Sequence, residues 1–216
     1  MFVITADQID SRNDRDRAGE LITDLTTKFG DSFMLPPDQT SGDEIQVLLT
    51  DAPACVDVIL AIHRTGHWTI GLGVGEVRRP LARSTRQSAG DAFIAARDAV
   101  TRAKRSDARF SLTSPPSEND ASGRSTPVLS SSEVEAIFAM LLLVRQRRTK
   151  EGWQAVDLLQ TGRTQAEVAA ELDISTAAVS QRIKAALWRT EESVRPALAR
   201  LLENLDRASS EMEPAA

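Results

Sequence analysis

Three acidic residues in the first half of the chain have the types and spacing that could hold a divalent cation. Asp7 and Asp10 follow a short apolar segment, and Asp43 follows Gly42 in the turn of an expected hairpin. If the first strand and this hairpin are neighbours in one sheet, Asp7 and Asp43 converge at its edge. Converging carboxylates repel each other, and a bound Mg²⁺ would relieve that repulsion and take nucleotide phosphates as further ligands.

A purely structural role for these acids is the alternative. Asp10 suits a helix N-cap or a turn, and Gly-Asp is a common hairpin turn. The residue spacing therefore leaves both explanations open. The alternating Gly71, Gly73 and Gly75 are similarly open, because they indicate a close approach by either a ligand or a partner helix.

A second group of residues, near the C-terminus, has the pattern of two short helices joined by a tight turn. Thr164 and Glu167 have capping-box spacing, and Ser175 is the expected N-cap of the next helix. The small residue Ala169 stands where two crossing helices must approach closely. Asp173 occupies a turn position that needs left-handed backbone geometry, which Asp tolerates. This pattern predicts a helix-turn-helix.

The second of these helices has a polar face suited to DNA. Val179, Ile183 and Leu187 recur at i, i+4 spacing and predict its buried stripe. Short hydrogen-bonding groups early in a helix, with cations along its flank, suit a major groove lined by phosphates. A structural helical hairpin without DNA binding is the alternative. The candidate DNA-binding residues are Thr164, Gln165, Ser175, Thr176, Ala177, Ser180, Gln181, Arg182 and Lys184.

The charge of the chain is unevenly distributed. The 216 residues carry a formal net charge of −5, yet residues 145–200 contain ten Lys and Arg against seven Asp and Glu. An apolar content of 41% and a charged content of 26% are ordinary for a soluble globular protein. The lone Cys55 is expected to be a buried structural thiol, and His63 and His67 are too few for a zinc site. Without a membrane-spanning or signal-peptide pattern, a cytoplasmic location is expected.

The elements that would position these residues fall into two groups. Ser, Thr, Pro and Gly dominate residues 106–131, which predicts a flexible linker between a domain at 1–105 and another at 132–208. Before the linker the expected order is β-α-β-β-α-β-α, that of a ferredoxin-like α+β sandwich with an added helix. Its expected strands cover residues 2–6, 32–35, 44–49 and 68–77, and its helices residues 14–29, 53–64 and 89–104.

After the linker only helices are expected. An apolar block at residues 136–144 is too apolar for a surface helix, so it is expected to be a domain core or a dimer seam. Trp153, Val156, Leu158 and Leu159 mark the next helix, and a last helix is expected over residues 191–206. This all-α second domain would contain the helix-turn-helix.

The first 105 residues resemble the SatD-type family of bacterial proteins, through the motifs ADQIDS, SGDEIQVLL, IGLGVGEV and GDAFIAARDAV. That family is in turn similar to a reduced class III nucleotidyl cyclase domain. The resemblance implies that Asp7 and Asp43 bind metal ions that hold a triphosphate, and that Arg97 assists. Phe93 stands where an Asn is expected, and Thr40 precedes the turn where a base-reading Lys is expected. The resemblance thus implies a metal–nucleotide pocket with an incomplete catalytic set.

The C-terminal pattern TQAEVAAELDIS followed by VSQRIK resembles the helix-turn-helix of sigma-factor-like and LuxR-like bacterial regulators. Together the two resemblances imply a transcriptional regulator that binds double-stranded DNA as a homodimer, with ATP or another nucleotide and Mg²⁺ as effector. Asp7, Asp10, Asp43 and Arg97 would line the effector pocket. An active nucleotidyl cyclase with a helical regulatory or dimerisation module is the main alternative. An adaptor for other proteins, with a degenerate sensor, is a third.

Overall fold

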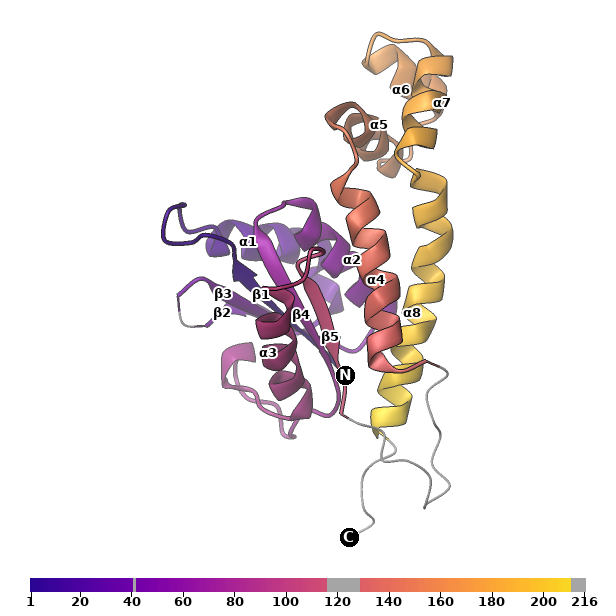
Figure 1. Ribbon diagram of the computed structural model, residues 1–216. Coiled ribbons are helices and arrows are strands. Elements are labelled where there is room, and N and C mark those ends of the chain that lie inside the picture. The colour runs from indigo at the N-terminus through magenta and orange to yellow at the C-terminus, as the bar shows by residue number, and fades with distance from the viewer. Residues whose placement is uncertain (41, 116–128, 211–216) are drawn as a thin grey trace.

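The chain forms one five-stranded sheet with helices on both faces, as the computed structural model shows for residues 1–40, 42–115 and 129–210 (Figure 1). The strand order is β2-β3-β1-β4-β5, with antiparallel neighbours except for the parallel pair β4 and β5. The predicted α+β class is therefore confirmed. The strands are β1 Phe2–Gln8, β2 Phe33–Gln39, β3 Glu44–Leu49, β4 Trp68–Val74 and β5 Phe110–Thr113.

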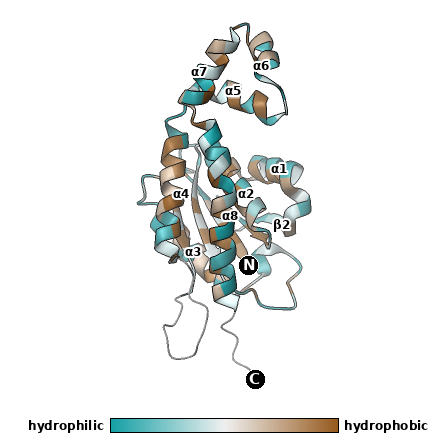
Figure 2. Cartoon of the chain, turned by 90° about the vertical axis from the view of Figure 1, so that its right-hand side faces the viewer, coloured by the Kyte–Doolittle hydropathy of each residue, from teal (hydrophilic) through white to brown (hydrophobic). Residues whose placement is uncertain are grey.

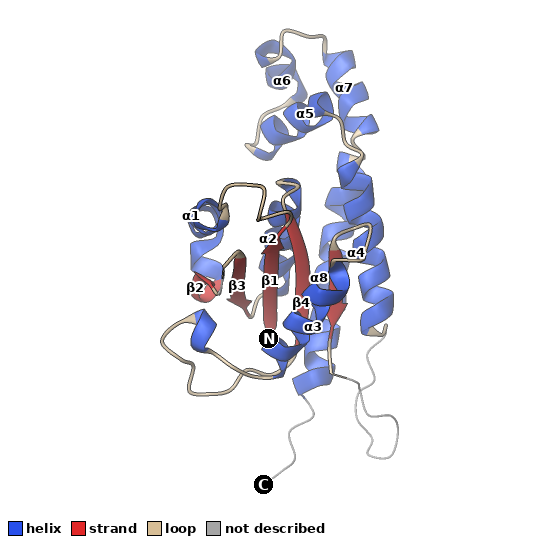
Figure 3. Cartoon of the chain, turned by 60° about the vertical axis from the view of Figure 1, so that its left-hand side comes forward, coloured by secondary structure: helices blue, strands red, loops and turns tan. Residues whose placement is uncertain are grey.

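Two layers of helices enclose the sheet (Figure 3). Helices α1, α2, α4 and α8 share one hydrophobic core with Phe2 and Ile4 of β1, whereas α3 packs on the opposite face against Val3. Alternate residues of a strand point to opposite sides, so the helices on the two sides bury both faces of β1. The helices are α1 Ala18–Phe29, α2 Ala52–Arg64, α3 Asp91–Ala103, α4 Ser131–Gln146, α5 Lys150–Gln160, α6 Gln165–Glu171, α7 Thr176–Ala185 and α8 Trp188–Ser210.

The alternating glycines of β4 allow α3 to lie directly on the strand. A Cβ atom at Gly71 would stand 2.2 Å from the backbone nitrogen of Val100, and one at Gly73 would stand 2.1 Å from the carbonyl oxygen of Ala92. Both distances are far inside van der Waals contact. At Gly71 and Gly73 the close approach is thus made by a partner helix.

Replacing Gly73 with alanine is expected to lower the free energy of unfolding by about 3 kcal/mol, because α3 must move away from the strand. Gly19→Ala is the matched control, since no atom lies within 4 Å of a Cβ atom there and α1 gains a better helix former. Urea unfolding followed by circular dichroism measures both variants. Equal stability of Gly73→Ala and the wild type would contradict this packing.

The predicted linker is wrong at its N-terminal end. Residues 110–113 form β5, whose Phe110 pairs with Ile70 of β4 and is fully buried. The Phe110 ring also stacks on Phe138 of α4, with ring centroids 5.2 Å apart. A four-residue strand beside a polar segment is too short to stand out in composition. The rest of the predicted linker includes residues 116–128, which lie outside the described residues.

The predicted separate domain at residues 132–208 is also wrong. Phe138 and Leu142 of α4, with Leu198 and Leu202 of α8, are fully buried in the core shared with α2 and the sheet. Both helices therefore belong to the sheet-containing body. Within the described residues, α5, α6 and α7 form a small hydrophobic cluster of their own.

Two smaller expectations can also be compared with the structure. Cys55 is buried with a free thiol, as predicted, and burial raises the pKa of that thiol. Helix α8 begins at Trp188 and ends at Ser210, which makes it longer at both ends than the predicted helix.

No helix in the described ranges combines the length and apolar character needed to cross a membrane.

Candidate nucleic-acid interface and acidic site

Helices α5, α6 and α7 form a compact unit at one end of the molecule, joined to the body by α4 and α8 (Figure 1). Ala155 of α5, Val168 and Ala169 of α6, and Val179 and Ile183 of α7 form its core. Ala169 is 5% exposed, which agrees with a small residue at a close helix approach. The unit has the geometry of a helix-turn-helix with one supporting helix.

The predicted caps are confirmed. The Thr164 hydroxyl accepts a hydrogen bond from the Glu167 backbone N–H at 3.3 Å, and the Thr164 N–H donates to Glu167 Oε2 at 2.7 Å. These bonds to Thr164 lower the pKa of Glu167. The Ser175 hydroxyl accepts from the Ala178 N–H at 3.1 Å and begins α7. Both helices therefore start where the sequence predicts.

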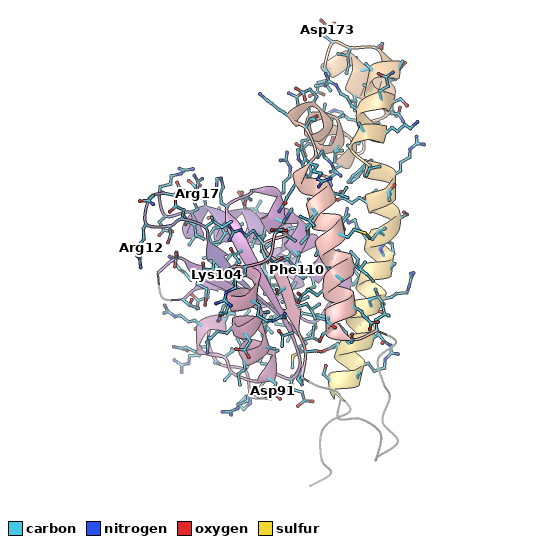
Figure 4. The ribbon with its side chains drawn as sticks, in the orientation of Figure 1. Arg12, Arg17, Asp91, Lys104, Phe110 and Asp173 are labelled. Atoms are coloured by element: carbon cyan, nitrogen blue, oxygen red, sulfur yellow. The ribbon has the colours of Figure 1, made fainter. Side chains whose placement is uncertain are left out.

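The turn between α6 and α7 has the predicted left-handed residue. Asp173 has φ of +51°, and the Ile174 N–H donates to the Ala169 carbonyl at 3.0 Å. Asp173 lies at the outermost tip of the molecule (Figure 4). The turn thus leaves α6 and α7 projecting away from the sheet.

The outward face of α7 is polar and exposed. Ala177, Ser180, Gln181 and Lys184 are exposed, and Ala177, Gln181 and Lys184 lie opposite the buried Val179 at helical spacing. The other candidate residues surround this face. Thr164, Ser175 and Thr176 are exposed, whereas Gln165 and Arg182 are half-buried.

Arg182 lies on the flank of α7 that faces α5. It lines a pocket of about 250 Å³ together with Arg147, Thr149 and Gln181. Arg147, which follows the last residue of α4, and Arg182 of α7 therefore line the same pocket beside the outward face of α7. The sequence pattern does not indicate Arg147, because it lies in the loop between α4 and α5, outside the helix-turn-helix.

Leu187 does not belong to the buried stripe of α7, contrary to the prediction. It is 45% exposed and has φ of +52°, because α7 ends at Ala185 and the chain turns before α8. Ala186, 4% exposed, takes the buried position instead. The i, i+4 spacing simply continued past the end of the helix.

A buried ionic network joins the helix-turn-helix to the body. Glu191 of α8 accepts hydrogen bonds from Arg145 and, at 2.7 Å, from Arg148. Arg145 also donates to the Leu60 carbonyl of α2 at 2.9 Å, and Arg148 donates to the Ala186 carbonyl at 2.8 and 3.1 Å. Arg145 and Glu191 are 5% and 2% exposed. Burial lowers the pKa of Arg145 to about 10.

The ring of Trp153 in α5 lies at the centre of this network. The guanidinium carbons of Arg64, Arg148 and Arg145 stand 3.6, 4.2 and 4.9 Å from the ring centroid. Cation–π contacts of this kind are attractive and gain strength when water is excluded. Because these residues come from α2, α4, α5 and α8, the network fixes the orientation of the helix-turn-helix on the body.

His63 lies beside the same network and supplies a pH-dependent prediction. Burial, with a contribution from Arg145, lowers the pKa of His63 to about 4, against 6.5 in an unfolded chain. Between about pH 6.5 and pH 4, His63 therefore binds a proton in the unfolded state but not in the folded state. The free energy of unfolding falls as the pH drops through this range.

At pH 5 this histidine is expected to remove about 2 kcal/mol of the stability present at pH 7. In His63→Gln the loss should be smaller by that amount, as measured by urea unfolding at the two pH values. His67 is present in both proteins, so the difference isolates His63. Equal losses in the wild type and the variant would contradict the prediction.

The acidic residues near the start of the sheet lie on adjacent strands. Asp7 of β1 pairs in register with Glu44 of β3, and the Gln8 N–H donates to the Asp43 carbonyl at 3.1 Å. The backbones of Asp7 and Asp43 are therefore neighbours, at the end of the sheet where β1 ends and β3 begins. The Asp7 carboxylate accepts a hydrogen bond from Lys104 Nζ at 2.9 Å.

The other residues expected in an effector pocket have different surroundings. Asp10 is in a turn with φ of +55°, and its carboxylate accepts from the Asn13 amide at 2.7 Å. Arg97 is exposed on α3, about two turns before Lys104. The cation that contacts Asp7 is Lys104, which the sequence motifs did not indicate. Within residues 1–40, 42–115 and 129–210, no group of three or more His, Cys, Asp and Glu side chains is arranged to hold a metal.

Polar side chains continue from Asp7 along the same sheet face. Thr5 shares a face with Asp7 and stands opposite Gln46 of β3. Thr5 and Gln46 are 0% and 3% exposed, and Thr5 Oγ1 has no hydrogen-bond partner within the described residues. A fully buried hydroxyl without a protein partner is unusual.

Comparisons with protein-family models, curated proteins and solved structures give no match to this chain. The described residues define an α+β protein whose sheet-containing body carries a helix-turn-helix unit at one end.

Proposed function

We propose that the protein is a DNA-binding transcriptional regulator. The exposed polar face of α7, projected from the body by a correctly capped helix-turn-helix, carries this proposal. Ser180, Gln181 and Lys184 supply hydrogen-bond donors and a cation along one side of the helix. A helix of this kind enters the major groove with its polar face towards the base edges.

The sheet-containing body would be the regulatory part, with a reduced nucleotidyl-cyclase-like fold of the SatD type. The strand order β2-β3-β1-β4 supports a ferredoxin-like arrangement. The adjacent backbones of Asp7 and Asp43 support a site for Mg²⁺ and a nucleotide there. Helices α4 and α8, which pack on the body and lead into the helix-turn-helix, would transmit a change at this site to α7.

The effector proposal predicts that Mg²⁺ with ATP or another nucleotide binds near Asp7. Isothermal titration calorimetry should give a binding signal for the wild type that Asp7→Ala weakens by at least about tenfold, since a ligand carboxylate is lost. Asp31→Ala removes an exposed acid elsewhere and is the matched control. Absence of heat with each common nucleotide and Mg²⁺ would contradict the effector site and leave the DNA-binding proposal intact.

An active nucleotidyl cyclase is a second candidate, favoured by the same adjacency of Asp7 and Asp43. Phe93 occupies the position expected for an Asn and is 4% exposed in the core under α3, so its side chain packs in the interior. Without the amide side chain of that Asn, the rate of cyclisation should be lower by orders of magnitude. Incubation with ATP or GTP and Mn²⁺, followed by detection of a cyclic product, would decide for the cyclase.

A further inference from the structure

Helix α4 has apolar side chains on both of its faces. Its inner face buries Val134, Phe138 and Leu142 in the core of the body. Its outer face centres on Met140, which at 65% is the most exposed large apolar side chain in the described part of the chain. Seen from the side of α4 and α8, α4 shows hydrophobic colour where α8 is mostly hydrophilic (Figure 2).

Met140 belongs to a continuous apolar stripe. At about 100° per residue, Ala136, Ile137, Leu143 and Val144 all lie within about 60° of Met140 around the helix. Ile137 and Leu143 are half-buried at the border of the core, and Ala136 and Met140 face solvent. An apolar stripe of this width is typical of a helix face that packs against another element.

Opposite charges close the two ends of the stripe. Glu133 lies in the first turn of α4, and Arg147 directly follows its last residue. Both are exposed, and each is seven residues from Met140, about 10.5 Å at the helical rise. Both fall on the line of Met140 around the helix. Apolar residues therefore lie at equal distances on both sides of Met140. One end of the stripe is negatively charged and the other is positively charged.

We propose that the outer face of α4 binds the same face of α4 in a second copy of the chain, antiparallel, about a two-fold axis beside Met140. In a two-fold interface the same patch serves both subunits. Antiparallel pairing brings Glu133 next to Arg147 of the partner subunit, whereas parallel pairing would bring like charges together. The surface that complements this charge pattern is therefore the same α4 stripe on a second copy of the chain.

This pairing gives a geometry to the homodimer expected of a DNA-binding regulator, and in that respect it rests on the proposed function. Each helix-turn-helix follows the C-terminal end of its own α4. Antiparallel pairing therefore places the two helix-turn-helix units at opposite ends of the dimer. Self-association is measured without DNA, so failure of this inference and failure of DNA binding remain distinguishable.

Sedimentation velocity of the full chain tests the surface. The wild type should be a dimer, and Met140→Glu should raise the dimer dissociation constant more than about tenfold. Ile94→Glu places the same charge at another exposed apolar side chain, 59% exposed on α3, and should leave the dimer intact. A monomeric wild type at about 100 μM, or a Met140→Glu variant as dimeric as the wild type, would overturn the inference.

Cysteine cross-linking tests the orientation. Ala136 and Val144 lie four residues on either side of Met140, so antiparallel helices bring Ala136 next to the partner's Val144. Under mild oxidation, a mixture of Ala136→Cys and Val144→Cys proteins should give a disulfide-linked dimer, and Ala136→Cys alone should not. The buried Cys55 remains in every protein as a constant background. A dimer linked through Ala136→Cys alone would show parallel helices and overturn the proposed geometry.

Discussion

Glu191→Gln is expected to lower the free energy of unfolding by about 4 kcal/mol, because it removes the only carboxylate that contacts Arg145 and Arg148 within the described residues. Both guanidinium groups are nearly excluded from water, with side chains 5% and 1% exposed. A buried cation that loses its counter-ion keeps its full desolvation penalty. Urea unfolding of the full chain at pH 7 measures the change.

The neighbouring acid provides a matched control. Glu192 forms an ion pair with Arg195 at 2.9 Å, but its side chain is 48% exposed. Exposed pairs contribute little, so Glu192→Gln should change stability by less than about 1 kcal/mol. If the two glutamine variants were equally stable, the buried network would not hold the helix-turn-helix on the body as described.

The second large effect is expected on DNA affinity. Arg182→Ala combined with Lys184→Ala should weaken binding to duplex DNA by at least about tenfold at 50 mM salt, and should reduce the salt slope by about two. Phosphate contacts release counterions, and each lost contact removes about one unit of slope. Fluorescence anisotropy with a labelled duplex at several salt concentrations gives both quantities.

Lys28→Ala and Arg200→Ala together are the control for that pair, since they remove the same charge from exposed positions on α1 and α8. They should leave the slope unchanged. Changes at Thr176 or Gln181 should act differently, because base-edge contacts determine sequence preference rather than overall affinity. Equal losses in the control and test proteins would indicate only a general charge effect.

Local signals were sufficient to predict the helix-turn-helix. Caps such as Thr164 and Ser175 act within one helical turn, and the left-handed Asp173 follows from the space between two capped helices. The prediction that Leu187 is buried is wrong because periodicity alone does not show where a helix ends. The core of the unit is small enough for nearest-neighbour patterns to determine it.

Long-range contacts were the part that the sequence did not reveal. Glu191 pairs with arginines more than forty positions earlier in the chain, and no local pattern links them. The four residues of β5 become a strand only because β4 offers a free edge and α4 covers Phe110. For the same reason the prediction of a separate domain that contains α4 is wrong, since the inner face of α4 belongs to the body. The adjacency of Asp7 and Asp43 was predictable because it follows from strand order.

Binding of the full chain to a random duplex library tests the central claim most directly. The full chain is required because α4 and α8 belong to the core of the body and do not form a separate domain with the helix-turn-helix. The wild type should bind duplex DNA at low salt and enrich a defined sequence, and the Arg182→Ala, Lys184→Ala protein should bind weakly. A correctly folded wild type that neither binds duplex DNA at about 50 mM salt nor enriches any sequence would contradict the proposed function.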